Sequence, residues 1–261
     1  MALCGRAPAG RRARRPRIFA PYAWGMRTLV LWDLDYTLLD CDGLGREAHE
    51  AAFTRITGRD PDLPFLGGRT DLGVIAEALL AHGIEPTRDR LDAGVAALEA
   101  EFAARADLLA ARGRALDGAA AALERLGADD GVVQSVLTGN LRPIAELKLA
   151  AYGLGAHLDL DAGAYGGDDV DRARLVGLAR ERATRRYGDA FDPAATVVIG
   201  DTPNDVTAGR RGGAYPIGVA TGRNSTGELR AAGAETVLTG LADLDGLLAA
   251  IRERPAARAR G

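Results

Sequence analysis

The amino-acid sequence predicts an α/β fold: a doubly wound parallel sheet with a helical segment inserted after its first strand. Short apolar runs at residues 30–32, 132–137 and 196–199 alternate with segments of helical spacing, which is typical of a parallel sheet with helices on its faces. In one long stretch after the first strand the alternation stops and no β-branched run occurs. We therefore predict an α/β core at residues 26–42 and 116–252 and a helical insert at residues 43–115.

The first strand ends in two carboxylates. The apolar run at residues 30–32 leads into Asp33 and Asp35, and side chains two positions apart on an extended chain point to the same side. Two adjacent carboxylates repel each other unless a cation holds them, and a hard divalent cation with oxygen ligands is the simplest holder. One carboxylate can then attack an electrophile while the other carries a proton. For this pair alone, a solvated acidic turn is the alternative interpretation.

The predicted insert consists of amphipathic helices. Leu72, Ile75 and Leu79 fall on one helical face, and glycines and prolines separate the helices. Before one helix stands Gly-Gly-Arg69-Thr70-Asp71. Either Arg69 reaches the site and binds a carboxylate or second phosphate of the substrate, or the segment is a capping turn that leaves Arg69 in solvent.

Two further strands of the core also end in polar side chains. The run at 132–137 leads into Thr138, Gly139 and Asn140, and the run at 196–199 leads into Asp201 and Asp205. The carboxyl ends of parallel strands open at the same edge of a sheet, so these side chains should gather beside the first pair of carboxylates. Taken singly, Thr138 is better explained as a turn or cap hydroxyl.

The remaining elements follow from the same alternation. We predict helices at 119–126, 143–152, 171–187, 203–212, 225–232 and 244–251, and short strands at 157–160, 216–219 and 236–238. The polar residues Asp168, Asp169 and Arg172 are expected to start and cap the helix at 171–187. The three histidines, His49, His82 and His157, have no motif around them and are expected in packing or surface positions.

Four motifs occur in a fixed order along the chain. They are Asp33-x-Asp35-x-Thr37, Thr138 after the second strand, Lys148 in the following helix, and Gly200-Asp201-x-x-x-Asp205. Each motif alone is weak, but the ordered set resembles the haloacid dehalogenase superfamily of phosphohydrolases. The resemblance implies a Rossmann-like core, a helical cap formed by the insert, and a magnesium-dependent phosphatase of the phosphoglycolate phosphatase-like branch.

The resemblance also implies a role for each motif residue. Asp33 would be the nucleophile that forms an aspartyl-phosphate, and Asp35 would protonate the leaving group and then activate water. Mg²⁺ would be held by Asp33, the backbone carbonyl of Asp35, and Asp201, with Asp205 outside the direct ligand set. The Thr138 hydroxyl would donate hydrogen bonds to the phosphate oxygens.

The Gly139 and Asn140 amides would complete this phosphate-binding loop. Lys148 is the only lysine among the 33 basic residues of the chain, and all the others are arginine. A compact ammonium at this position could contact the carboxylate of Asp33 and a phosphate oxygen together.

Within the superfamily, the second carboxylate narrows the activity. Displacing a halide needs no proton on the leaving group, so Asp35 argues against carbon–halogen cleavage. The insert contains no lysine, which argues against phosphonate cleavage through a Schiff base. A sugar phosphomutase stays open as an alternative, and so does a non-catalytic phosphate-binding or phospho-accepting regulatory module.

Composition bounds the partners. A net charge of −3 gives no reason to expect nucleic acid, and no apolar run approaches the ~20 residues of a membrane helix. We expect a cytoplasmic monomer or homodimer that acts on a small phosphorylated metabolite. The arginine-rich residues 1–25 are expected to be a disordered or artefactual extension, and residues 253–261 a frayed tail.

Overall fold

The computed structural model describes residues 27–254. The extension expected at 1–25 and most of the expected tail lie outside the described residues. Within them, the element order is a first strand, a run of helices, and then alternating helices and strands. This is the predicted α/β class.

A five-stranded parallel sheet forms the centre of the core, in the order β4-β1-β5-β6-β7. Its strands are β1 (Thr28–Trp32), β4 (Val132–Val136), β5 (Thr196–Gly200), β6 (Tyr215–Val219) and β7 (Thr236–Leu238). The first strand therefore lies between the two strands whose ends carry the other motifs. This order brings all three strand ends together at one edge of the sheet.

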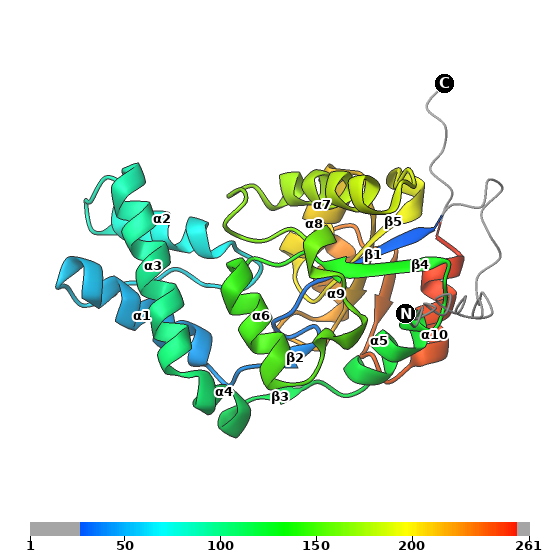
Figure 1. The fold of residues 1–261 in the computed structure, drawn as a ribbon, viewed down its shortest axis with the longest axis horizontal. Coiled ribbons are helices and arrows are strands. Elements are labelled where there is room, and N and C mark those ends of the chain that lie inside the picture. Colours follow the sequence, from blue (N-terminus) through cyan, green and yellow to red (C-terminus); the bar gives the residue numbers. More distant parts are fainter. Residues whose placement is uncertain (1–26, 255–261) are drawn as a thin grey trace, which may run out of the picture.

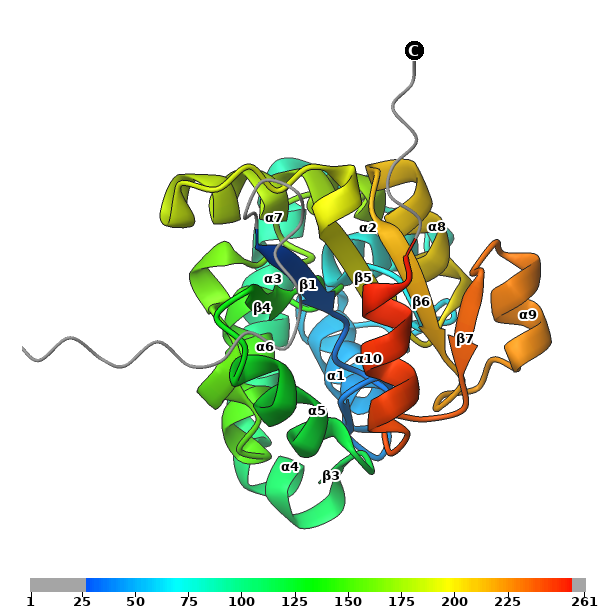
Figure 2. The same ribbon diagram turned by 90° about the vertical axis from the view of Figure 1, so that its right-hand side faces the viewer.

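Alternate side chains of each strand supply two hydrophobic layers. Leu29 and Leu31 pack with Val198 and the apolar face of α7 (Arg172–Tyr187) on one face of the sheet. On the opposite face Val30 and Trp32 pack with α5 (Ala119–Gly127), α6 (Arg142–Ala151) and α10 (Leu244–Arg252). Figure 2 shows α7 and α8 (Pro203–Gly212) on one side and α5 and α10 on the other. The short α9 (Thr226–Ala231) packs beside β6 and β7.

The helical insert comprises α1 (Leu44–Thr57), α2 (Asp71–Ala81), α3 (Arg88–Ala104) and α4 (Ala106–Arg112). These helices lie beyond the carboxyl end of β4, on the side to which its arrow points (Figure 1). Residues such as Phe53, Leu79 and Leu98 give the insert a hydrophobic cluster, which also includes Leu141 and Ile144 of the core. The insert is therefore packed against the core as well as within itself.

The two chain segments that join insert and core pair with each other. Leu39–Asp40 (β2) and Arg114–Ala115 (β3) form a short antiparallel ladder. We did not predict this ribbon, because two-residue strands are too short for an alternation of apolar and polar residues to be visible. It fixes where the chain leaves the core and where it returns.

The strand expected at 157–160 is wrong. That stretch runs from the end of one 3₁₀ turn, Gly155–His157, to the start of another, Leu160–Ala162. The Asp159 side chain accepts a hydrogen bond from the Asp161 amide at 3.1 Å, which bends the chain locally, while the Asp159 amide makes only one strand-like bond, to the Gln134 carbonyl at 2.8 Å. A local side-chain bond thus outcompetes a sheet ladder.

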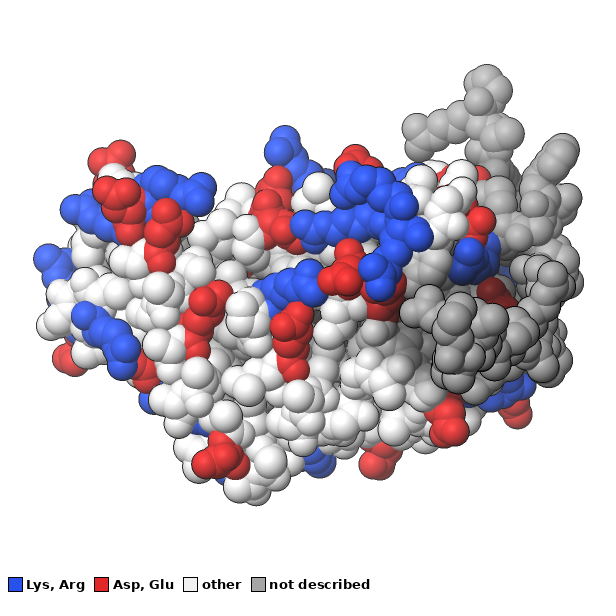
Figure 3. Space-filling model, viewed as in Figure 1, with Lys and Arg blue, Asp and Glu red and all other residues white. Residues whose placement is uncertain are grey.

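Acidic and basic side chains are interspersed on the face shown in Figure 3. Arginines gather over α7, but Arg182 pairs with Asp168 at 2.7 Å and Arg186 pairs with Asp159. No helix within residues 27–254 has the length and apolar character needed to cross a membrane.

Candidate active site

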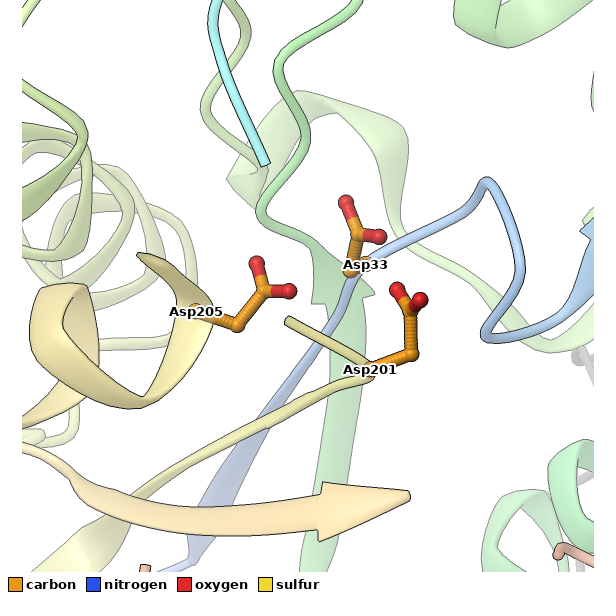
Figure 4. Close-up of side chains that lie close together, drawn as sticks. All are labelled: Asp33, Asp201 and Asp205. Atoms are coloured by element: carbon orange, nitrogen blue, oxygen red, sulfur yellow. The ribbon is translucent and has the colours of Figure 1, made fainter. Parts of the chain in front are cut away.

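Three carboxylates converge at the carboxyl edge of the sheet (Figure 4). Asp33 follows β1, Asp201 follows β5, and Asp205 stands in the first turn of α8. Carboxylate oxygens of all three lie within 4.8 Å of one another, and all three residues are buried. The three side chains therefore lie close together, as the sequence predicts.

The start of α8 fixes one of these carboxylates. Thr202 is the N-cap, and Asp205 Oδ2 accepts hydrogen bonds from the Thr202 amide at 3.0 Å and hydroxyl at 2.6 Å. This is a capping box, in which a helix-terminal side chain and a cap satisfy each other. Because one oxygen of Asp205 is already engaged, this residue is suited to orient its neighbours.

Arg172 is a member of the site that the sequence analysis missed. We expected it to help start helix α7, and it is the first residue of that helix, but the N-cap is Asp171 and the Arg172 side chain is buried. Its Nη2 lies 2.6 Å from Asp33 Oδ1, 2.5 Å from Asp205 Oδ1 and 3.2 Å from the Leu137 carbonyl oxygen. One guanidinium thus contacts two of the three carboxylates.

The remaining charge in this cluster is reflected in its pKa values. Burial, with help from Asp205, raises the pKa of Asp33 to about 7, although Arg172 opposes this. Burial and the carboxylates of Asp205 and Asp33 raise the pKa of Asp201 to about 9. Buried like charges hold on to protons unless a cation is present. The cluster therefore carries more negative charge than its one arginine compensates.

The residues fit a hard divalent cation. Carboxylate oxygens are the ligands that Mg²⁺ and Ca²⁺ take. Within residues 27–254, the ion pair of Asp33 with Arg172 uses only Oδ1 of Asp33, and Asp201 forms no ion pair. Asp205 differs, because Thr202 and Arg172 engage both its oxygens. The geometry agrees with a metal ion that is bound by Asp33 and Asp201, with Asp205 holding the neighbouring side chains in place.

The second carboxylate of the first motif lies apart from this cluster. Asp35 accepts hydrogen bonds from Lys148 Nζ at 2.7 Å on each of its oxygens, and from Asn140 Nδ2 at 3.0 Å. Lys148 is 2% exposed, and its Nζ lies 5.2 Å from the centre of the Phe102 ring of the insert. Burial lowers the pKa of Lys148, but Asp35, Cys41 and Asp71 together raise it by more, so the ammonium stays charged.

This arrangement corrects one expectation. We expected the ammonium of Lys148 to contact Asp33, whereas its carboxylate partner in the structure is Asp35. The cation beside Asp33 is Arg172. The position of Lys148 in a helix follows from the sequence, but its burial and its partner depend on how α6 packs on the sheet.

The turn between the two carboxylates and β2 is backbone-strained. Tyr36 has a φ of 59°, a left-handed conformation that glycine adopts without cost. The Thr221 hydroxyl donates to the Tyr36 carbonyl oxygen at 2.5 Å, and the Tyr36 amide donates to the Leu39 carbonyl oxygen at 2.6 Å. The loop after β6 therefore holds this turn, and with it the direction of Asp35.

The segment Thr138–Asn140 forms a tight turn after β4. The Asn140 amide donates to the Thr138 hydroxyl oxygen at 3.2 Å. A side chain at Gly139 is excluded, since its Cβ would lie 1.8 Å from the Arg69 carbonyl oxygen. Glycine is thus required here by the close approach of the insert.

A cavity of about 390 Å³ lies between the core and the insert, lined by the site residues. Arg69 lines this cavity, but its guanidinium pairs with Glu77 of α2. Thr70 is the N-cap of that helix and accepts from the Gly73 amide at 3.1 Å. Both interpretations of this stretch thus have support, because the capping turn exists and Arg69 faces the cavity.

The match to known families identifies the class of protein. The family model for haloacid dehalogenase-like hydrolases matches residues 30–210. These residues contain all four motifs and the whole insert. The chain belongs to this hydrolase family.

Among individual proteins, "Probable phosphatase IndB" from Dickeya dadantii (strain 3937) is 29% identical over 228 residues, covering 85% of this chain and 93% of that protein. A haloacid dehalogenase family hydrolase from Deinococcus radiodurans R1, solved with bound phosphate and sodium, is 26% identical with a TM-score of 0.51 and coverage of 85% and 95%. The "Putative beta-phosphoglucomutase" from Bacteroides vulgatus shares the fold, with a TM-score of 0.65, 18% identity and coverage of 87% and 91%.

Proposed function

We propose that this protein is a magnesium-dependent phosphatase that hydrolyses a small phosphomonoester through an aspartyl-phosphate on Asp33. The observation that carries the proposal is the buried cluster of Asp33, Asp201 and Asp205 beside one arginine at the carboxyl edge of the sheet. The phosphatase name of the Dickeya relative and the phosphate bound in the Deinococcus hydrolase support it.

The nucleophile in this proposal is Asp33. A carboxylate needs no general base at neutral pH, and its attack on phosphorus gives an anhydride that water can hydrolyse. Arg172 Nη2 donates a hydrogen bond to Asp33 Oδ1, so the guanidinium holds the nucleophile's carboxylate in one orientation. The guanidinium would also stabilise the charge that gathers on the phosphoryl oxygens during transfer.

Asp35 would carry the proton. In the first half-reaction it gives a proton to the oxygen of the departing alcohol, and in the second it takes one from the attacking water. Lys148 and Asn140 hold its carboxylate in one orientation. A proton carrier must be held in a fixed position relative to the leaving oxygen, and these contacts support that function for Asp35.

The metal would be held by the Asp33 and Asp201 carboxylates and the backbone carbonyl of Asp35. When bound, Mg²⁺ would screen the repulsion between the nucleophile and the phosphate. The Thr138 hydroxyl and the Gly139 and Asn140 amides, which we call the phosphate-binding loop, would donate to phosphate oxygens.

Substrate size follows from the cavity. A volume of about 390 Å³ lies in the range of small-molecule sites, so a metabolite rather than a macromolecule fits between core and insert. We propose that the insert acts as a cap, which contributes the cavity wall and so selects the substrate.

The proposal is tested by phosphate release from p-nitrophenyl phosphate and from a panel of phosphorylated metabolites. We expect turnover with Mg²⁺, loss of turnover in EDTA, and recovery when Mg²⁺ is restored. Turnover that survives thorough chelation would overturn the metal assignment. An isomerised sugar phosphate without free phosphate would instead identify a mutase.

The proton-carrying function of Asp35 gives a prediction about leaving groups. Asp35→Asn should reduce kcat by roughly 100-fold for alkyl phosphates, the lower end for loss of an acid–base group, and much less for p-nitrophenyl phosphate, whose anion leaves without a proton. The measurement is kcat for both substrates in the variant and wild type. Equal losses for the two substrates would rule out the acid function.

Arg69 gives a prediction about specificity. If its guanidinium leaves Glu77 to bind a distal anion, Arg69→Ala should raise KM about tenfold for a substrate with a second acidic group and leave p-nitrophenyl phosphate nearly unchanged. Arg88→Ala is the matched control, since Arg88 is an exposed arginine of the insert that pairs with Asp92 outside the cavity lining. An unchanged substrate profile would leave Arg69 as part of a capping turn only.

A further inference from the structure

A buried histidine and a buried carboxylate of the insert face each other at the cavity wall. His49 Nε2 lies 3.4 Å from Asp71 Oδ1, and the two side chains are 6% and 8% exposed. His49 Nδ1 lies 3.0 Å from the Gly45 carbonyl oxygen. A carbonyl oxygen can only accept a hydrogen bond, so Nδ1 carries a hydrogen. Nε2 is buried and has no hydrogen-bond partner in the described chain, and Asp71 Oδ1 is the carboxylate oxygen that it faces.

The tautomer has a consequence for the neighbouring carboxylate. If Nε2 carried no proton and Asp71 were ionised, a lone pair would face a buried negative charge, which is a costly arrangement. One proton between the two atoms removes the repulsion. It gives either an imidazolium beside a carboxylate or a neutral imidazole beside a carboxylic acid.

The opposite side of Asp71 contacts the core. Its Oδ2 accepts from the Leu141 amide at 2.8 Å, and its own amide donates to the Gly139 carbonyl oxygen at 2.7 Å. One residue of the insert thus binds both ends of the stretch 139–141. The fit is tight, because no side chain at Gly139 would clear the Arg69 carbonyl oxygen.

We propose that His49 and Asp71 share one proton, and that this pair positions the phosphate-binding loop from the insert side. The inference rests on the phosphatase proposal for its effect on catalysis, whereas the shared proton stands on geometry alone. The other charged groups that face Asp71 are Lys148 from α6 and Asp35 from the turn after β1. Both residues are positioning residues, since neither contacts Asp33, the proposed nucleophile.

The Asp71→Asn variant distinguishes a shared proton from a contact that only fills space. The amide oxygen can still accept from Leu141, and the amide nitrogen can donate to a neutral His49, so the variant keeps its contacts only while His49 is neutral. We expect kcat/KM close to wild type at pH 8. The ratio of variant to wild type should then fall about tenfold for each pH unit below about 6.5, the ordinary histidine pKa.

His49→Gln is the conservative rescue. A glutamine amide can donate to Asp71 without a titratable proton, so its ratio to wild type should not change with pH. His82→Gln is the matched control in the same insert. His82 Nδ1 lies 2.9 Å from the Ala78 carbonyl oxygen, but its Nε2 faces the Asp60 carbonyl oxygen rather than a carboxylate.

The proton itself is read by imidazole nitrogen NMR of the full, magnesium-loaded chain. The chain has 3 histidines, so His49→Gln and His82→Gln assign the spectrum. The His49 nitrogen signals of wild type should be the same at pH 6 and pH 8, whereas those of Asp71→Asn should differ between the two. This measurement needs no turnover, so it stays decisive if the phosphatase proposal fails.

The loop is tested separately by inorganic phosphate as a competitive inhibitor. Asp71→Ala should raise its inhibition constant about tenfold at pH 8, the size expected for one lost buried hydrogen bond, while Asp71→Asn should not. Three results would each overturn the inference: wild-type His49 signals that differ between pH 6 and pH 8, a pH-independent kcat/KM ratio in Asp71→Asn, or unchanged phosphate inhibition in Asp71→Ala.

Discussion

Asp33→Asn should abolish turnover, with kcat lower by roughly 10⁴-fold or more, the scale seen when a nucleophile is removed from an enzyme. No other carboxylate of the site is placed to replace it. Asp35 is held by Lys148 and Asn140, and Asp205 is engaged by the start of its own helix. An amide cannot form the acyl phosphate. The measurement is single-turnover and steady-state phosphate release.

The fold should tolerate this substitution. Asp33 keeps its charge in a buried cluster at a cost, as its pKa of about 7 shows. A neutral side chain of the same shape removes part of the repulsion with Asp201 and Asp205. The Tm of the metal-free variant should therefore equal or exceed that of wild type. Asp92→Asn, an exposed carboxylate of the insert, is the control for charge removal alone. Turnover within tenfold of wild type would disprove the nucleophile assignment.

The carboxylates of the site could be predicted from the sequence because each stands directly after an apolar strand. Asp33 and Asp201 follow five-residue buried strands, and parallel pairing places the ends of neighbouring strands together. Asp205 follows from the helix that begins at Pro203. In these cases position along the chain determines position in space, since only the period of the strand and the direction of the sheet are needed.

Arg172 could not be predicted in this way. The sequence places it at the start of a helix, where a capping function is the simplest explanation, and arginine is the commonest cation of this chain. Its contact with Asp33 joins residues 139 positions apart. That contact depends on α7 beginning at the carboxyl edge of the sheet, which is a property of the packed core.

His49 and Asp71 show the same limit within the insert. Each residue lies in or at a helix of ordinary amphipathic pattern, and neither belongs to a motif. Their meeting depends on how α1 and α2 pack, and the bond from Asp71 to Leu141 depends on how the insert sits on the core. Helix packing sets such contacts, and the sequence pattern of one helix contains no information about its neighbour's rotation.

The two buried cations, Arg172 and Lys148, contact different carboxylates, so their removal should have different kinetic effects. Arg172→Met should reduce kcat about 1,000-fold for alkyl and aryl phosphates alike, because Arg172 contacts the nucleophile, whose reaction is common to both. Lys148→Met should reduce kcat more for alkyl than for aryl phosphates, because Lys148 contacts Asp35, whose proton matters only for a poor leaving group.

The thermal stability of the Arg172→Met variant provides a second, independent test. Without its guanidinium, Asp33, Asp201 and Asp205 face one another with no cation, so the Tm of the metal-free protein should fall and Mg²⁺ should restore part of it. Arg174→Met is the matched control, since Arg174 lies two residues further along α7, is exposed, and pairs with Asp169. The opposite result would be that Lys148→Met lowers kcat equally for both ester classes while Arg172→Met keeps its turnover. In that case Lys148 would be the cation that assists Asp33 in catalysis, and the contacts of Arg172 would be structural only.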